Sequence, residues 1–308
     1  MADPTPVPPD LAPAARLLDP AAVAAALRRM AVPAQPPWLH GEVARRMAQR
    51  LGVVRLQPET LVDWWGHTGA SAALLAAAYP KARRIVVEPT EALLQRSFAD
   101  AQRPWWSAQR RARATEVRRD DPAPGAAQLL WANMMLHAVP DPPALLARWE
   151  RLLAVGGFVM FSCLGPGTLR ELRALYREFG WPPPAPGFVD MHDFGDMLVQ
   201  AGFADPVMDQ ETLILTWDSP QALLAELRSL GSNASPARWP ALRTPRWREQ
   251  LWAGLRSLAG PDGRLRLSFE IVYGHAFKAA PRMPVAGESA VSLADMRALL
   301  HAPRANRR

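Results

Sequence analysis

The stretch LVDWWGHTGAS, Leu61 to Ser71, decides the fold of this chain. Its apolar run, Leu61 and Val62, predicts a buried strand that ends near the acid Asp63, and the run SAALLAAAY from Ser71 predicts a helix. A loop that contains two glycines joins the strand to the helix. A strand, a tight turn and a helix in this order are how a Rossmann-like sheet presents backbone N–H groups to a nucleotide-like ligand.

An acid follows the next expected strand. The apolar run from Ile85 to Val87 ends in Glu88, which lies 19 residues beyond Gly69. Nucleotide-binding α/β folds place an acid about 20 residues beyond the glycine loop, where it hydrogen-bonds ribose hydroxyls. A carboxylate at the end of a strand can equally be a solvated cap, so two interpretations of Glu88 stand.

Strands and helices alternate along the rest of the chain. We expect helices over 19–31 and 39–52, a weak strand at Thr115–Val117, strands at Leu129–Ala132 and Phe158–Cys163, a helix capped by Asp141 and ended by Gly156 and Gly157, and edge strands at Thr212–Trp217 and Leu267–Phe277. This rhythm predicts an α/β chain with a Rossmann-like, doubly wound, seven-stranded and mostly parallel sheet.

The expected domain organisation is one α/β domain with two tails. Residues 1–18, rich in proline, are predicted to be disordered, and 279–308 to form a tail with a short helix at about 292–301. The domain at 19–278 would carry a helical lid at 164–200 and a helical insertion at 220–262. Within the lid, Thr168 with Glu171 and Asp190 with Asp193 have the spacing of capping boxes.

Cysteine content and the pattern of apolar residues limit the expected cell compartment and the expected metal chemistry. Cys163 is the single cysteine, so no internal disulfide can form, and no Cys/His spacing resembles a metal site. A cytoplasmic protein is expected, because the N-terminus lacks the pattern of a signal peptide and no apolar run approaches the roughly 20 residues of a membrane span.

The chain is basic, with a formal charge of +7 and a pI of about 10.5. The densest basic patch runs from Arg96 to Arg119 and includes Trp105 and Trp106, aromatics that could stack on bases. A composition biased toward Ala, Pro and Arg explains the charge as well, and no nucleic-acid-binding motif accompanies it. Binding to nucleic acid is therefore the weaker interpretation.

Longer motifs resemble a known family. The glycine loop, Glu88 and LLWANMMLH (129–137) resemble the class I S-adenosylmethionine-dependent methyltransferases. More specific segments resemble the BioC family, the malonyl-[acyl-carrier protein] O-methyltransferases of biotin synthesis: GPGTLREL (165–172), FVDMHDFGDMLVQAGFADPVMD (188–209), ELRSLG (226–231) and FEIVYGHAFK (269–278). The resemblance covers roughly residues 38–278.

The resemblance implies S-adenosyl-L-methionine as cofactor and an acidic acyl carrier protein with a malonyl thioester as substrate. It implies cofactor-binding roles for Asp63, Gly66, Thr68, Gly69, Glu88, Asp121 and Asn133. The accepting carboxylate is ionised at neutral pH and needs no general base. His137 is the one candidate for a catalytic side chain, although it could equally be a loop residue satisfied by backbone, and Asn133 could simply satisfy a strand end.

The cofactor loop departs from the family pattern GxGxG, because Trp65 and His67 replace two of its glycines. Glycine allows a close approach to the ligand and a positive φ. The acid expected at the start of the fourth strand is Gln128 here. These changes are the evidence for an alternative hypothesis, a catalytically degenerate methyltransferase-fold protein that acts by protein binding. It ranks second after an active methyltransferase, and a nucleic-acid methyltransferase ranks third.

Overall fold

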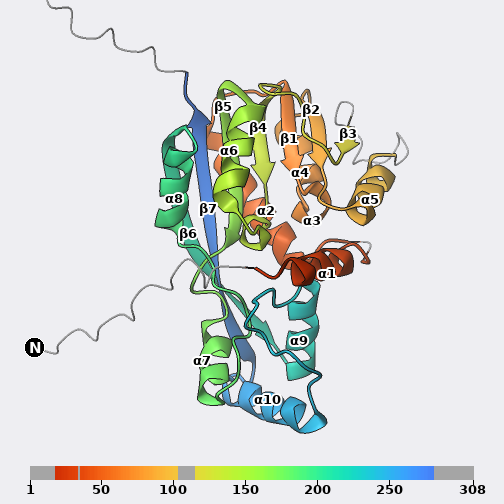
Figure 1. Cartoon of the computed structure of the whole chain (residues 1–308), viewed down its shortest axis with the longest axis vertical. Coiled ribbons are helices and arrows are strands. Elements are labelled where there is room, and N and C mark those ends of the chain that lie inside the picture. Colours follow the sequence, from red (N-terminus) through yellow and green to blue (C-terminus); the bar gives the residue numbers. More distant parts are fainter. Residues whose placement is uncertain (1–17, 34, 103–114, 281–308) are drawn as a thin grey trace, which may run out of the picture.

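A computed structural model describes residues 18–33, 35–102 and 115–280. Along the chain, helices alternate with strands as predicted (Figure 1). The helices are α1 (Pro20–Met30), α2 (Trp38–Arg50), α3 (Gly66–Gly69), α4 (Ala72–Ala78), α5 (Glu91–Ala101), α6 (Pro142–Leu152), α7 (Arg170–Glu178), α8 (Met191–Gln200), α9 (Pro220–Ser229) and α10 (Pro245–Ser257), with 3-10 turns η2 (Leu51–Val53) and η3 (Leu136–Ala138). The strands are β1 (Thr60–Trp64), β2 (Arg83–Val87), β3 (Thr115–Arg118), β4 (Ala127–Ala132), β5 (Leu153–Leu164), β6 (Phe203–Trp217) and β7 (Leu265–Lys278).

All seven strands form one sheet, in the order β3-β2-β1-β4-β5-β7-β6. The first five strands in this order run parallel, and β7 runs antiparallel to both of its neighbours. The order reverses between β1 and β4, which is the switch point at which open α/β sheets bind ligands beyond the carboxyl ends of their strands. The predicted doubly wound, mostly parallel, seven-stranded sheet is confirmed.

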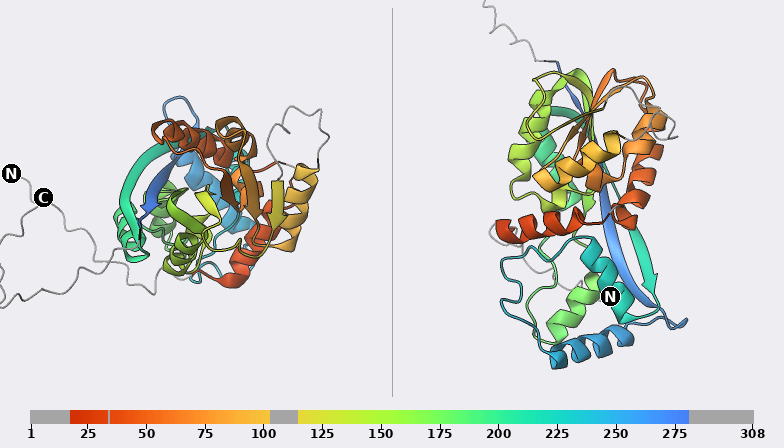
Figure 2. Two further views of the ribbon diagram at one scale, coloured as in Figure 1. Left: turned by 90° about the horizontal axis from the view of Figure 1, so that it is seen from above. Right: turned by 90° about the vertical axis from the view of Figure 1, so that its right-hand side faces the viewer.

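Helices cover both faces of the sheet, as the view from above shows (Figure 2). Successive strand residues point to opposite faces, so Leu61 packs with α2 and α4 whereas Val62 packs with α6 and α8. Leu129 and Leu130 on β4 divide in the same way. Apolar residues on both sides of each central strand explain why these strands are continuous hydrophobic runs in the sequence.

The long strands β6 and β7 extend past the other strands of the sheet. Their far ends form a lower lobe together with α7, α9 and α10 (Figure 1). Its buried leucines, among them Leu172, Leu223 and Leu255, belong to the same apolar cluster as α2 and the α2 face of the sheet. The lobe therefore shares its core with the sheet.

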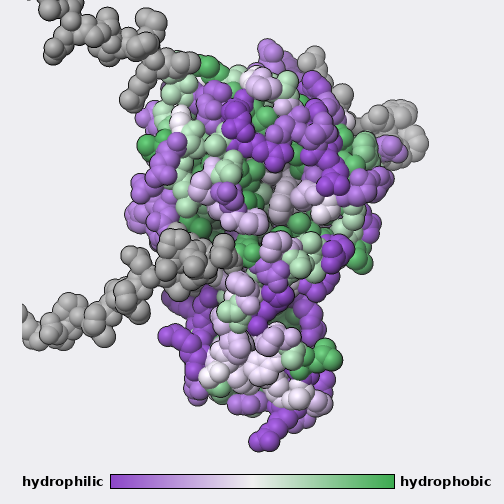
Figure 3. Space-filling view, viewed as in Figure 1, coloured by the Kyte–Doolittle hydropathy of each residue, from purple (hydrophilic) through white to green (hydrophobic). Residues whose placement is uncertain are grey.

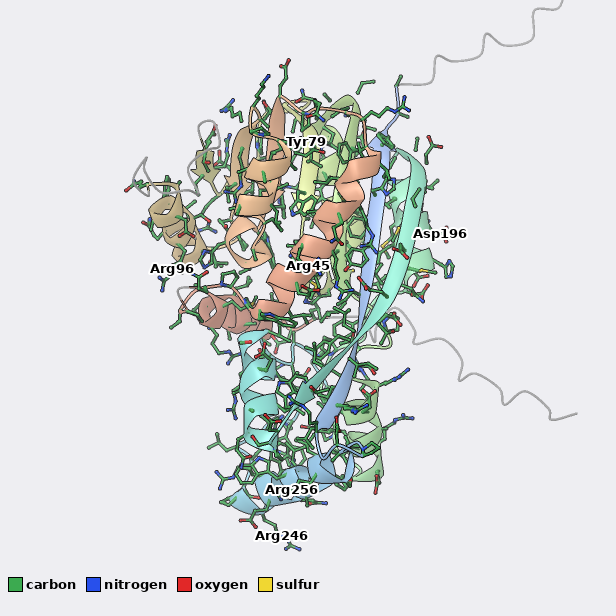
Figure 4. All side chains as sticks on the ribbon, turned by 180° about the vertical axis from the view of Figure 1, so that it is seen from behind. Arg45, Tyr79, Arg96, Asp196, Arg246 and Arg256 are labelled. Carbon is green, nitrogen blue, oxygen red and sulfur yellow. The ribbon has the colours of Figure 1, made fainter. Side chains whose placement is uncertain are left out.

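The helix α1 lies at the waist between the sheet and the lower lobe in two views (Figures 1 and 2). The N–H of Asp19 donates to the carbonyl of Ala234 at 2.8 Å, and the Asp19 carboxylate pairs with Arg238 at 2.6 Å. On the other side, Arg96 of α5 donates to the carbonyls of Ala31 and Val32 at 2.8 and 2.6 Å (Figure 4). These contacts fix α1 to both parts.

The segment 164–200, predicted as a helical lid, is divided between the two parts. The helix α7 packs with α10 and β7 in the lower lobe, whereas α8 packs on β6, β7 and α6. In the predicted insertion at 220–262 the structure places α9 and α10. The lid and insertion boundaries stay predictions.

Two local expectations are wrong. The helix α6 ends at Leu152, and Gly156 and Gly157 lie inside β5, where the pairing with β4 shifts register. Thr168 does not cap α7, because its hydroxyl donates to the carbonyl of Glu270 and accepts from that residue's N–H, at 3.0 and 3.1 Å. The carboxylate of Glu171 accepts instead from Ser268 on β7.

Other expectations fall outside the described residues. These are the N-terminal tail up to residue 17, the part of the basic patch from 103 to 114 with Trp105 and Trp106, and the C-terminal tail from 281 with its helix at about 292–301. The described part contains no helix that is long and apolar enough to cross a membrane.

Candidate cofactor site

A cleft of about 330 Å³ opens at the carboxyl ends of β1, β2 and β4. Its walls include Trp65 after β1, Glu88 after β2 and Met135 after β4. Val23 and Leu27 of α1 close one side, and Leu145 and Arg148 of α6 close another. The cleft therefore lies at the switch point of the sheet, with mostly apolar walls and few polar groups, as small-molecule sites usually have.

Trp65 has a backbone conformation that favours glycine. Its φ is 56°, in the left-handed region, which costs a residue with a Cβ about 1–2 kcal/mol. Its N–H donates to the carbonyl of Val87 at 2.7 Å, and its ring packs against both the sheet and α1. The side chain therefore forms a wall of the cleft.

Glu88 is buried at the end of β2, with an exposed fraction of 1%. Its Oε1 accepts from the N–H of His67 and from the hydroxyl of Ser97, both at 2.7 Å, whereas Oε2 has no partner among the described residues. Burial raises the pKa of Glu88 to about 7, although both hydrogen bonds oppose the shift. One carboxylate oxygen is thus left for a hydroxyl donor in the cleft.

Asp63 is completely buried in β1, and its Oδ2 accepts from Arg84 Nε and Nη2 at 2.9 and 2.5 Å. Burial raises the pKa of Asp63, and the charge of Arg84 opposes this shift. A Cβ on Gly66 would lie 2.8 Å from Val86 and 2.9 Å from this carboxylate. Gly66 is therefore needed for the approach of the loop to its own sheet.

Thr68, Gly69 and Asn133 meet inside the protein rather than in the open cleft. The carbonyl of Thr68 accepts from His40 Nδ1 at 2.7 Å. Asn133 donates to the carbonyls of Gly69 and His40 at 2.7 and 2.8 Å and accepts from Ser162 at 2.7 Å. Burial lowers the pKa of His40 to about 4, so this network contains a neutral imidazole. It holds the loop against β4 and α2.

Asp121 lies beside the cleft and forms an ion pair with Arg148 of α6. The guanidinium of Arg148 stands 4.9 Å from the centre of the Trp64 ring and lines the cleft. In this arrangement Asp121 positions a cation at the cleft. Sequence reasoning did not single out Arg148, because the pairing joins residues 27 positions apart.

His137 lies on η3, next to the cleft residue Ala138. Its Nδ1 accepts from the N–H of Leu164 at 3.4 Å, and its ring stands edge-on to Phe188 with centroids 6.0 Å apart. Burial lowers its pKa, so the ring is neutral at pH 7. These contacts also fit the alternative of a loop residue satisfied by backbone, and the catalytic role of His137 stays a prediction.

The structure brings the predicted residues together at one edge of the sheet, but only some of them line the cleft. Within the described part of the chain, Glu88 lines the cleft and has a buried, unpaired Oε2, and Asp63, paired with Arg84 on β2, has an unpaired Oδ1 as well. Thr68, Gly69 and Asn133 belong to the hydrogen-bond network that holds the loop, and the cofactor-binding roles stay predictions. Sequence reasoning missed α1 as a wall of the cleft. Across the described ranges, no group of three His, Cys, Asp or Glu side chains could hold a metal ion.

Comparisons with known proteins identify the chain. Its strand order and Rossmann-like architecture are those of the methyltransferase fold class, and the YcgJ protein from Bacillus subtilis has a similar structure, with a TM-score of 0.53 at 9% identity over 78% of this chain and 99% of that chain. No protein-family model matches the sequence.

Two curated relatives are closer in sequence. The malonyl-[acyl-carrier protein] O-methyltransferase of Laribacter hongkongensis is 37% identical over 79% of this chain and 84% of its own length. The protein of the same name from Gallionella capsiferriformans is 36% identical over 80% and 86%. This chain belongs to the malonyl-[acyl-carrier protein] O-methyltransferase family.

Proposed function

We propose that this chain transfers a methyl group from S-adenosyl-L-methionine to the free carboxylate of malonyl-[acyl-carrier protein], a step of biotin biosynthesis. The observation that carries the proposal is the buried, unpaired Oε2 of Glu88, in a cleft at the switch point of a chain from this family. A cytoplasmic location stays a prediction from the sequence.

The residues of the cleft fit the adenosine part of the cofactor. Glu88 Oε2 can accept from a ribose hydroxyl, and the apolar side chains of Trp65, Val87, Met135 and Leu145 suit the faces of an adenine ring. A buried acceptor without a donor costs about 1–3 kcal/mol, and a bound hydroxyl would remove this cost. When bound, S-adenosyl-L-methionine supplies an activated methyl group on a sulfonium.

The remaining chemistry needs position rather than acid or base. A malonyl carboxylate is ionised at neutral pH, so no residue of the chain has to remove a proton. Holding the two reactants in line can contribute roughly 7 kcal/mol or more. Burial lowers the pKa of His40 and of His137, so both imidazoles are weak bases.

The partner is proposed to be an acidic acyl carrier protein. The chain carries a formal charge of +7, and Arg246 and Arg256 project from α10 at the end of the lower lobe (Figure 4). Hydrophilic residues and smaller apolar patches share the face seen in Figure 3. Complementary charge would speed the encounter with such a partner and make it sensitive to salt.

Calorimetric titration with S-adenosyl-L-methionine and with its demethylated product tests the proposal. We expect binding at micromolar concentrations, and then methyl transfer to malonyl-[acyl-carrier protein], detected as the mass of the methyl ester. Absence of binding heat at millimolar ligand would contradict the proposal.

A degenerate protein that acts by protein binding is the second candidate, because Trp65 occupies a wall of the cleft where the family has glycine. It predicts no cofactor binding together with a complex between this chain and the carrier protein. The same titration, followed by a pull-down with the carrier protein, separates the two candidates.

A further inference from the structure

Arg173 of α7 carries a partly buried guanidinium whose hydrogen bonds to the described residues all go to backbone oxygens. Nε donates to the carbonyl of Thr168 at 3.1 Å, Nη1 to Ala185 at 3.3 Å and Nη2 to Pro186 at 2.6 Å. A guanidinium has five N–H donors. These three bonds therefore leave one N–H free on each terminal nitrogen.

The described part of the chain provides no carboxylate for Arg173. Arg84 and Arg148, by contrast, pair with Asp63 and Asp121. Burial lowers the pKa of Arg173, and no neighbouring anion opposes the shift. A cation withdrawn from water without a counter-ion is costly, and such residues are seldom buried unless they are paired. The missing anion points to a ligand.

Ring contacts connect the guanidinium to the end of the sheet at which the cleft opens. The central carbon of the guanidinium stands 5.3 Å from the centre of the Phe188 ring, and Phe188 stands edge-on to His137. His137 belongs to η3, the turn after β4 that also supplies Ala138 to the cleft. Arg173 therefore approaches from the lower lobe the same edge of the sheet at which the cleft opens.

We propose that Arg173 binds the free carboxylate of the acyl substrate, an inference that rests on the proposed function. Its two free N–H groups hold one carboxylate oxygen and leave the other to attack. A bond forms between that oxygen and the methyl carbon while the carbon–sulfur bond breaks and its electron pair stays on sulfur. No proton moves in this step.

The proposal also explains how acid and product would be distinguished. The carboxylate is an anion and pairs with the guanidinium, whereas the methyl ester is neutral. Hydrogen bonds to a charged group contribute more than hydrogen bonds between neutral groups. The site should therefore bind the acid much more tightly than the ester, and the reaction itself would weaken binding of its product.

The test compares Arg173→Gln and Arg173→Lys with the control Arg177→Gln, which changes an exposed arginine of the same helix. For Arg173→Gln we expect KM for malonyl-[acyl-carrier protein] to rise about 30- to 100-fold. The preference for the acid over the methyl ester, measured as a ratio of binding affinities, should fall to near unity. Affinity for S-adenosyl-L-methionine should stay unchanged, and Arg177→Gln should behave like the wild type.

Arg173→Lys separates a charge role from a structural one. A lysine keeps the charge but lacks the forked N–H groups. We expect it to restore part of the preference for the acid, with KM raised only about 10-fold. If Arg173→Gln does not fold, the ratio of affinities in Arg173→Lys decides, and a ratio equal to that of the wild type overturns the inference.

Failure of the inference differs from failure of the proposed function. A wild type that methylates the malonyl substrate, with an Arg173→Gln variant that keeps the preference for the acid, overturns the inference alone. A wild type that neither binds S-adenosyl-L-methionine nor methylates the malonyl substrate overturns the proposed function and the inference together.

Discussion

The turn after β1 and the end of β2 meet at the same cleft, yet they differ in how far they depart from the family pattern. The turn carries Trp65 and His67 at two positions where the pattern GxGxG has glycine, whereas the end of β2 carries the expected acid, Glu88. Two backbone groups of the turn bond to the end of β2: the N–H of His67 donates to Glu88 and the N–H of Trp65 donates to the carbonyl of Val87, both at 2.7 Å. Because both donors are backbone groups, these bonds do not depend on the side chains at positions 65 and 67.

The difference between the turn and the end of β2 shows that the backbone conformation of a loop does not fix which side chains it carries. Trp65 retains a left-handed φ of 56°, and the turn still closes on β2 through its bond to Val87. The ring of Trp65 then becomes part of the cleft wall, while the ring of His67 is buried toward Asp100. On the loop side the wall of the cleft is thus apolar, and Glu88 supplies a polar group at the end of β2.

The largest expected effect concerns the buried charge at the end of β2. The pKa of Glu88 rises from 4.5 to about 7 on folding, so between these pH values the folded state binds more protons than the unfolded state. Its contribution to the free energy of unfolding therefore falls as pH rises through this window. For Glu88→Gln, we expect stability relative to the wild type to increase by roughly 3 kcal/mol between pH 4.5 and 7.

Urea unfolding at pH 4.5, 5.5 and 7 measures this difference. The pKa of His40 falls from 6.5 to about 4, which gives a contribution of the opposite sign, because here the unfolded state binds more protons between these values. That contribution is present in both proteins and cancels in the comparison. Parallel stability curves for the variant and the wild type would contradict the assignment of a raised pKa to Glu88.

The next effect concerns the ligand. In Glu88→Gln the Oε1 atom can still accept from His67 and Ser97, but an amide group replaces the unpaired Oε2. At a pH above the raised pKa of Glu88, loss of this charged acceptor for a hydroxyl costs about 2 kcal/mol, so the Kd for S-adenosyl-L-methionine should rise roughly 30-fold. Glu91→Gln, at an exposed position of α5, is the matched control. Equal affinity of the two variants would show that Glu88 does not face the cofactor.

Most of the sheet could be predicted from the sequence, because buried parallel strands are short apolar runs that end in polar residues. The first half of β6 could not. Only Thr212–Trp217 was predicted, whereas β6 begins at Phe203. Its first part contains Pro206 and charged residues beside a shift in register, features that weaken a strand pattern and are tolerated at a sheet edge.

For the site, the spacing of acids predicted where Glu88 lies but not which way the neighbouring rings point. The left-handed φ of Trp65 redirects its side chain, and a sequence does not reveal that a tryptophan will keep a glycine conformation. The wall formed by α1 depends on contacts such as that of Arg96 with Ala31, across 65 positions. Such long-range contacts leave no periodic signal.

The smallest expected effect is that of a substitution in the turn after β1. Trp65→Gly removes an apolar wall of the cleft and relieves the cost of a left-handed φ, about 1 kcal/mol. We expect stability to change little, because lost packing offsets the relieved strain, and the Kd for S-adenosyl-L-methionine to rise about 10-fold, since roughly 50 Å² of apolar contact contributes about 1.4 kcal/mol. Calorimetric titration of the variant measures this change. A gain of affinity would instead mean that Trp65 obstructs the cleft, and would favour the protein-binding candidate over a repacked working site.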